Sequence, residues 1–125
     1  MGLVAHNSRR RTDGFTLLEI LVVMALVGIL SAIAIQQYSS YRSRGVDTQM
    51  RSDLKNAALA MESYFSVFRS YPSSLASLIS TGFRQTEGVS LNITVVTPFV
   101  YTLTASKPNG TQASFTYSSA TGQIN

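Results

Sequence analysis

Residues 14–19 read Gly-Phe-Thr-Leu-Leu-Glu and open an apolar run that continues to Ile35. Between Phe15 and Ile35 the only strongly polar side chain is Glu19. At a rise of 1.5 Å per residue, a helix over these residues is roughly 30 Å long, which matches the hydrocarbon thickness of a bilayer. The run therefore predicts a helix that can span a membrane.

Glu19 is the unusual residue of this run. A charge placed in lipid costs about 2.5–3.5 kcal/mol on insertion scales, so a carboxylate there needs a partner. One interpretation is purely structural: Glu19 lies near enough to the helix N-terminus to reach the interface or to be stabilised by the helix dipole.

The apolar run follows a basic leader, Arg9-Arg10-Arg11-Thr12-Asp13-Gly14. Basic residues ahead of a span favour retention of that end on the cytoplasmic side. Together with Phe15, Glu19 and the apolar run, this leader resembles the class III signal of type IV prepilins. The resemblance is specific over residues 9–44 and is one of pattern only over residues 45–125.

The resemblance implies processing by a prepilin peptidase, which cuts between Gly14 and Phe15 and then methylates the new amine of Phe15. Gly14 lacks a side chain, so the backbone at the cleavage point can lie close to a protease. Glu19 would then be the counter-charge for the α-amino group of Phe15 in a neighbouring subunit, because two ions that are costly alone in lipid are tolerated as a pair. Residues 1–14 are accordingly expected to be a cleaved leader.

An ordinary secretory signal is a competing interpretation. Residues 17–30 would be its hydrophobic region, and Ala32-Ile33-Ala34 would be its cleavage site. However, the apolar run continues through Ile35, and such a region rarely contains a carboxylate like Glu19. Both features favour the prepilin signal.

Residues 15–44 are expected to form a helix that spans the membrane and later the core of a fibre. Its expected packing positions are Leu17, Leu18, Ile20, Leu21, Gly28, Tyr38 and Tyr41. The two tyrosines also suit the aromatic belt of a membrane interface. Many members of the family carry a proline at the position of Gln36. Its absence predicts a straighter helix there, with any local unwinding dependent on Gly28 and Ser31.

Residues 45–125 are expected to form a head that begins with an amphipathic helix over residues 45–70. Its apolar stripe recurs at three- and four-residue spacing and comprises Val46, Met50, Leu54, Ala57, Ala58, Met61, Phe65 and Phe68. The opposite, solvent-facing side is expected to hold Asp47, Arg51, Asp53, Lys55 and Glu62, with Asp47 and Arg51 as an ion pair. Tyr71-Pro72 ends the helix, and a loop over residues 71–88 follows. Phe83, Arg84 and Glu87 in this loop are candidates for lateral contacts with neighbouring subunits.

Alternating threonine, valine and aromatic residues after Gly88 predict three antiparallel strands over residues 89–96, 99–105 and 112–117. The last two would be joined by a turn over residues 107–110, in which Asn-Gly supplies positive φ. The expected inward side chains are Leu91, Ile93, Val95, Phe99, Tyr101, Leu103, Phe115 and Tyr117. The predicted fold class is α+β, with a long N-terminal helix and a small antiparallel sheet over residues 89–125 packed on its second half.

The composition argues against an enzyme. The 125 residues include no cysteine, which excludes disulfides, thiolate metal sites and cysteine nucleophiles. The single histidine, His6, lies in the predicted leader, and the acids are scattered over a helix and a loop. We therefore expect no catalytic residue, cofactor or metal site. From Phe15 onward there are seven basic and five acidic residues, too small an excess to indicate general nucleic-acid binding.

The resemblance implies a structural subunit of a type IV pilus-like fibre that serves adhesion, twitching motility or DNA uptake. Such a subunit is held in the inner membrane as a single-pass precursor and is then displayed on the cell surface. The implied partners are further copies and other pilins, the prepilin peptidase, and an inner-membrane assembly platform with its ATPase. Whether the fibre binds nucleic acid stays open.

Two alternatives remain: a pseudopilin of a type II secretion system, and a membrane-anchored domain with a single span that never polymerises. Pseudopilins often hold a C-terminal calcium with carboxylates. This chain has no acid beyond Glu87, which argues modestly for a pilus subunit.

Overall fold

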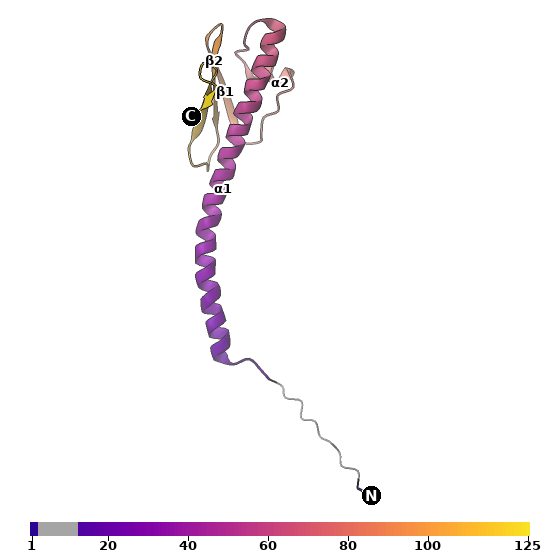
Figure 1. Cartoon of the computed structure of the whole chain (residues 1–125), viewed down its shortest axis with the longest axis vertical. Helices are drawn as coiled ribbons and strands as arrows, with labels where there is room; N and C mark the ends of the chain where they lie inside the picture. The colour runs from indigo at the N-terminus through magenta and orange to yellow at the C-terminus, as the bar shows by residue number, and fades with distance from the viewer. Residues whose placement is uncertain (3–12) are drawn as a thin grey trace. The chain divides into compact units, whose positions relative to one another are not determined.

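The computed structural model describes residues 1–2 and 13–125 (Figure 1). Most of the predicted leader, with His6 and the three arginines, lies outside the described residues. The elements in chain order are α1 Leu17–Phe68, α2 Leu75–Ser80, β1 Ser90–Thr97, β2 Val100–Ser106, β3 Ser114–Ser118 and β4 Gln123–Ile124. One long helix followed by a small antiparallel sheet confirms the predicted α+β class.

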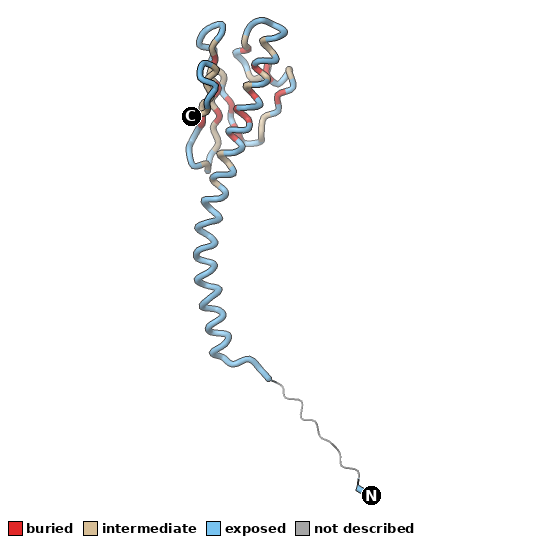
Figure 2. Tube along the Cα trace, in the orientation of Figure 1, coloured by how far each residue is buried: buried red, intermediate tan, exposed pale blue. Residues whose placement is uncertain are grey.

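The chain divides into two compact units, Met1–Gln37 and Tyr38–Asn125. In the first unit, every residue of α1 is exposed (Figure 2). The helix continues through Gln36 without a break, as expected without a proline there. Near Gly28, the Ser31 hydroxyl donates to the carbonyl of Val27 at 2.7 Å. By length and composition, α1 is suited to cross a membrane.

The second unit contains a four-stranded sheet in the order β1-β2-β3-β4, with every neighbouring pair antiparallel. Its core is formed by α1, α2, the loop between α2 and β1, and one face of the sheet. The largest fully buried apolar side chains are Met50, Leu54, Met61, Leu78, Tyr101, Leu103 and Phe115. The predicted helix stripe and the predicted inward positions of β2 and β3 thus meet in one core.

The sheet differs from the prediction at the β1–β2 hairpin. Val95 and Phe99, expected to face inward, are 37% and 76% exposed. The pairing of β1 with β2 shifts between Val95 and Thr97, and such a bulge interrupts the alternation of faces. Phe99 precedes the first residue of β2 and therefore belongs to the connection.

A fourth strand closes the sheet. Backbone hydrogen bonds of 2.8 and 2.9 Å join Thr116 and Asn125, and Ile124 lies opposite Tyr117. The strand is only two residues long, which is too short for an alternating pattern to reveal it.

The charged face of the helix also differs from the prediction. Asp53, expected in solvent, is 1% exposed, whereas Phe68 of the expected stripe is 58% exposed. The Asp53 carboxylate accepts hydrogen bonds from the backbone nitrogen of Thr86 at 2.8 Å and from its hydroxyl at 2.6 Å. A buried carboxylate is tolerated when donors satisfy it in this way.

Asp47 and Arg51 take other partners than each other. Asp47 accepts hydrogen bonds from the backbone nitrogen and the hydroxyl of Thr111. Arg51 lies over the ring of Phe115, with its guanidinium carbon 4.2 Å from the ring centroid. The first contact joins α1 to the loop between β2 and β3, and the second joins α1 to β3. They replace the predicted ion pair within the helix.

The loop between β2 and β3 is longer than a four-residue turn. Asn109 has the positive φ that was expected, at 68°, but Gly110 is not among the residues with positive φ. A Cβ on Gly110 would lie 2.7 Å from a carboxylate oxygen of Asp47 and 2.9 Å from the carbonyl of Gln112. Close approach, and not backbone conformation, explains the glycine at this position.

We therefore expect Gly110→Ala to destabilise the second unit by about 1–3 kcal/mol, the usual effect of overpacking. Urea unfolding of the full chain in detergent micelles measures the change. Gly45→Ala is the matched control, because an added Cβ there meets nothing within 4 Å and alanine favours a helix. Equal stability of the two variants would contradict the crowding at Gly110.

Candidate assembly site

The N-terminus of α1 is fixed by a reciprocal pair of side chains. The Thr16 hydroxyl accepts a hydrogen bond from the backbone nitrogen of Glu19 at 3.2 Å. In return, the Glu19 carboxylate accepts from the backbone nitrogen of Thr16 at 2.8 Å and from its hydroxyl at 3.1 Å. Thr16 and Glu19 thus form a capping box, which satisfies donors that a helix start would leave unpaired.

Sequence reasoning missed Thr16 as a functional residue. Its signal was present, since Thr16-Leu17-Leu18-Glu19 has the threonine and glutamate at the spacing of a capping box. The structural interpretation of Glu19, as a residue stabilised near the helix start, is correct in part. Within residues 13–125, the hydrogen bonds to Glu19 come from Thr16, a neutral residue that does not compensate the negative charge.

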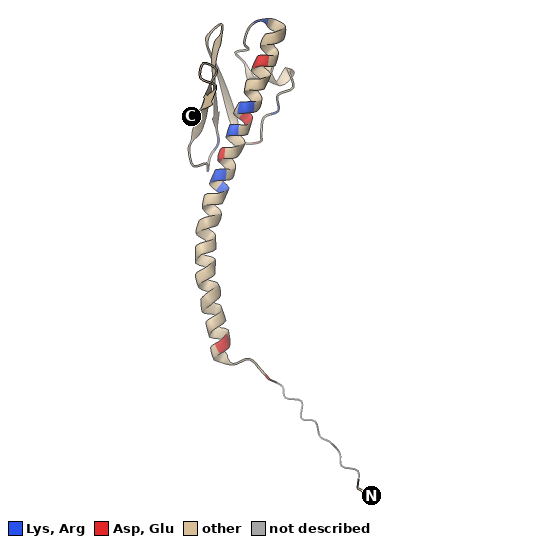
Figure 3. Cartoon of the chain, in the orientation of Figure 1, with Lys and Arg blue, Asp and Glu red and all other residues tan. Residues whose placement is uncertain are grey.

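Glu19 lies in an apolar groove on the first unit. Phe15, Leu18, Glu19, Ile20, Val22 and Val23 line this open groove of about 450 Å³. Along α1 the next charged residue after Glu19 is Arg42 (Figure 3). The groove can therefore bind a cationic group that is attached to an apolar side chain.

The residues predicted for cleavage lie just before the helix. Gly14 is exposed, and nothing lies within 4 Å of a Cβ placed on it. Phe15 is 85% exposed and is outside α1. The backbone that joins these two residues is thus open to an enzyme.

The predicted packing positions are exposed in the single chain. The exposed fraction ranges from 49% for Ile20 to 85% for Leu17. The remaining large side chains of this set, also exposed, are Leu18, Leu21, Tyr38 and Tyr41. A Cβ on Gly28 would meet nothing within 4 Å. These positions form surface that a bilayer or other helices can cover.

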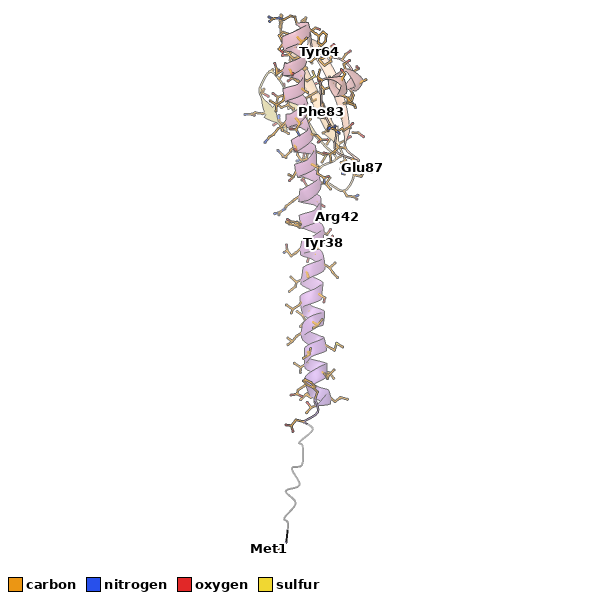
Figure 4. All side chains as sticks on the ribbon, turned by 90° about the vertical axis from the view of Figure 1, so that its right-hand side faces the viewer. Met1, Tyr38, Arg42, Tyr64, Phe83 and Glu87 are labelled. Atoms are coloured by element: carbon orange, nitrogen blue, oxygen red, sulfur yellow. The ribbon has the colours of Figure 1, made fainter. Side chains whose placement is uncertain are left out.

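One candidate for lateral contacts is corrected. Phe83 is 4% exposed and belongs to the core of the second unit, so it cannot reach a neighbouring subunit (Figure 4). The sequence alone does not show whether an apolar residue in a loop is buried, because the path of the loop is not known from the sequence. Arg84 and Glu87 of the same loop are exposed.

The remaining ionisable cluster, in the second unit, is structural. Glu62 accepts hydrogen bonds from the hydroxyls of Tyr71 at 3.1 Å and Tyr101 at 3.2 Å. Burial, together with the charge of Glu62, raises the pKa of Tyr101 well above its usual range. Burial and the hydrogen bond to Glu62 also raise the pKa of Tyr71. Both phenols therefore stay protonated and donate to Glu62. Among the described residues, no three acidic or histidine side chains are grouped to hold a metal ion.

Comparison with known proteins decides the family. Residues 9–35 match the model of the prokaryotic N-terminal methylation motif. The chain is 35% identical over 103 residues to the type IV wide pilus major component PilA4 of Thermus thermophilus, and the match covers 82% of this chain and 79% of that protein. The chain belongs to the type IV pilin family. Its resemblance to prepilins at residues 9–44 is thereby confirmed.

Two further relatives match a shorter part of this pilin. It is 39% identical over 66 residues to the type IV major pilin protein PilA of Myxococcus xanthus, covering 53% of this chain and 29% of that protein. It is 38% identical over 65 residues to the type II secretion system core protein G of Pseudomonas aeruginosa, covering 52% of this chain and 46% of that protein.

Proposed function

We propose that this pilin is a structural subunit of a type IV pilus and that it polymerises through the first part of α1. The observation that carries the proposal is the exposed apolar surface of residues 15–35, in which Glu19 is the only charged side chain. A contiguous exposed apolar surface of this kind marks a site that contacts a membrane or another protein. We infer that the inner membrane covers it in the precursor and that the helices of other subunits cover it in the fibre.

Cleavage between Gly14 and Phe15 would create the missing cation. It converts the amide nitrogen of Phe15 into an ammonium group beside an apolar ring. Such a group matches the groove that holds the uncompensated charge of Glu19. We infer that the methylated amine of Phe15 in one subunit pairs with Glu19 of the next, which would set their register.

Extraction of the subunit from the membrane needs an external source of free energy. Lipid tails are about as apolar as the helices that replace them, so the exchange is close to neutral in hydrophobic free energy. We therefore infer an assembly platform driven by an ATPase, alongside a prepilin peptidase and other pilins as partners. Adhesion, twitching motility and DNA uptake are the roles proposed for the finished fibre.

A pseudopilin is the second candidate function, because the secretion core protein G is a relative. The match to that protein covers 52% of this chain, whereas the match to the wide pilus component covers 82%. This difference favours a pilus subunit over a secretion pseudopilin.

The proposal is tested by the intact mass and N-terminal sequence of the protein from membranes and from sheared surface fibres. We expect a chain that begins at methylated Phe15 in both fractions. A start at Met1 would instead support an unprocessed membrane anchor, and a start at Ile35 would support a secreted domain.

Gly14→Leu is expected to leave the chain uncleaved and absent from surface fibres, since a bulky side chain keeps the backbone away from the peptidase. Asp13→Asn is the matched control, because it changes the neighbouring residue without adding bulk. It should be processed as in the unmodified chain. Normal processing of Gly14→Leu would contradict the assigned cleavage point.

A further inference from the structure

The second unit has a groove of about 480 Å³ between α1 and the loop that follows β2. Tyr38, Tyr41, Arg42 and Gly45 line it from α1, and Lys107 lines it from the loop. We call it the basic groove. Tyr38 and Arg42 lie one turn apart on α1 (Figure 4). The volume of the basic groove is in the range of sites that hold small molecules.

The residues that line this groove carry two positive charges, on Arg42 and Lys107, and no negative charge. The Lys107 ammonium donates to the side-chain oxygen of Gln49 at 2.8 Å and to the backbone carbonyl of Glu87 at 2.7 Å, and both acceptors are uncharged. Arg42 is exposed. Asp47, the acid of α1 nearest in sequence, does not line the groove, and its carboxylate accepts hydrogen bonds from Thr111 in the loop. Two cations therefore face a cavity with aromatic walls.

Sequence position places this groove at the membrane surface. Tyr38 and Arg42 follow Ile35, the last residue of the apolar run, by three and seven residues. In a chain that spans the membrane through that run, the residues just beyond it lie among the lipid headgroups, where tyrosines are also enriched. Lipid phosphates are thus the anions found at this level.

We propose that the basic groove binds the phosphate headgroup of an anionic phospholipid while the subunit is in the membrane. Arg42 presents a planar fork of donors that suits two phosphate oxygens, and Lys107 adds a point charge. Gly45 keeps the groove open, because nothing lies within 4 Å of its Cβ position. The proposal rests on membrane insertion alone, so it stands or falls independently of fibre assembly.

The test uses the full chain in nanodiscs that contain equal amounts of phosphatidylglycerol and phosphatidylcholine. Native mass spectrometry after release counts the lipids that each protein retains. The unmodified chain is expected to retain phosphatidylglycerol in preference to phosphatidylcholine. Arg42→Gln should lower this retention about fivefold, the usual effect of one basic residue at a membrane surface.

Gly45→Leu tests the shape of the groove without a change in charge. It should also abolish the preference, because a leucine side chain would fill the cavity, while α1 gains helix propensity. Arg84→Gln is the control, since this exposed arginine lies outside the basic groove, and it should retain phosphatidylglycerol as the unmodified chain does.

Three outcomes would overturn the proposal. Equal retention of both lipids by the unmodified chain would show that the groove has no preference for the anionic lipid. Equal losses of phosphatidylglycerol from Arg42→Gln and Arg84→Gln would show that any surface arginine has the same effect. Displacement of the lipid by millimolar inorganic phosphate would show a site for free anions instead of lipid.

Discussion

Replacement of Glu19 by glutamine is expected to abolish surface fibres while the precursor still inserts into the membrane. In the proposed pairing, the substitution would leave the ammonium group of Phe15 without a counter-charge in apolar surroundings. Loss of one partner from a buried ion pair typically costs about 3–5 kcal/mol, and the loss recurs at every subunit of the fibre. Immunoblots of sheared fibres and of membranes measure the two fractions.

Glutamine at position 19 separates the proposed charge pairing of Glu19 from its role in the capping box. A glutamine at the third helical position can still complete a capping box with Thr16, so the start of α1 should persist. Thr16→Val is the matched control, because it removes the capping hydroxyl and keeps the carboxylate. It should lose only about 0.5–2 kcal/mol of helix stability and still form fibres. Normal fibre from Glu19→Gln, or none from Thr16→Val, would show that capping and not charge pairing is the important role.

Asp53→Ala is expected to destabilise the second unit by about 2–4 kcal/mol. The substitution removes a fully buried acceptor and leaves both the backbone nitrogen and the hydroxyl of Thr86 without their partner. Hydrogen bonds to charged groups are worth more than neutral ones, and an orphaned donor away from water adds its own cost. Urea unfolding of the full chain in detergent micelles measures the change.

Asp47→Ala is the control for this prediction. Asp47 makes the same pair of contacts, to the backbone nitrogen and hydroxyl of Thr111, but it is only partly buried. Water can replace the lost acceptor there, so we expect a smaller loss of stability. A loss at Asp47 as large as that at Asp53 would show that burial does not set the strength of these contacts.

The features that the sequence predicts well are those with a local and repeated pattern. The apolar run to Ile35 and the spacing of Met50, Leu54 and Met61 are regular over several helical turns, and each behaves in the structure as its periodicity predicts. The capping box at Thr16 and Glu19 was equally readable, because it depends on two residues three positions apart.

The features that escaped prediction depend on contacts between distant parts of the chain. Asp53 has the polarity of a surface residue, and only Thr86, 33 positions later, makes its burial possible. Phe83 lies in a loop whose path is fixed by the core that it joins. At the candidate site, the sequence supplies Gly14, Phe15 and Glu19 but not the groove that Phe15 and Glu19 help to line, which appears only when the helix is built.

The strands of the sheet lie in space in the same order as in the chain. Each new strand pairs with the one before it, and none must be inserted between two strands that are already joined. In a chain that is exported from its N-terminal end, β2, β3 and β4 can therefore each pair with a strand that is already outside. Such nearest-neighbour pairing closes only short loops and favours rapid folding. The sheet can thus be completed in step with export, with β4 as the final addition.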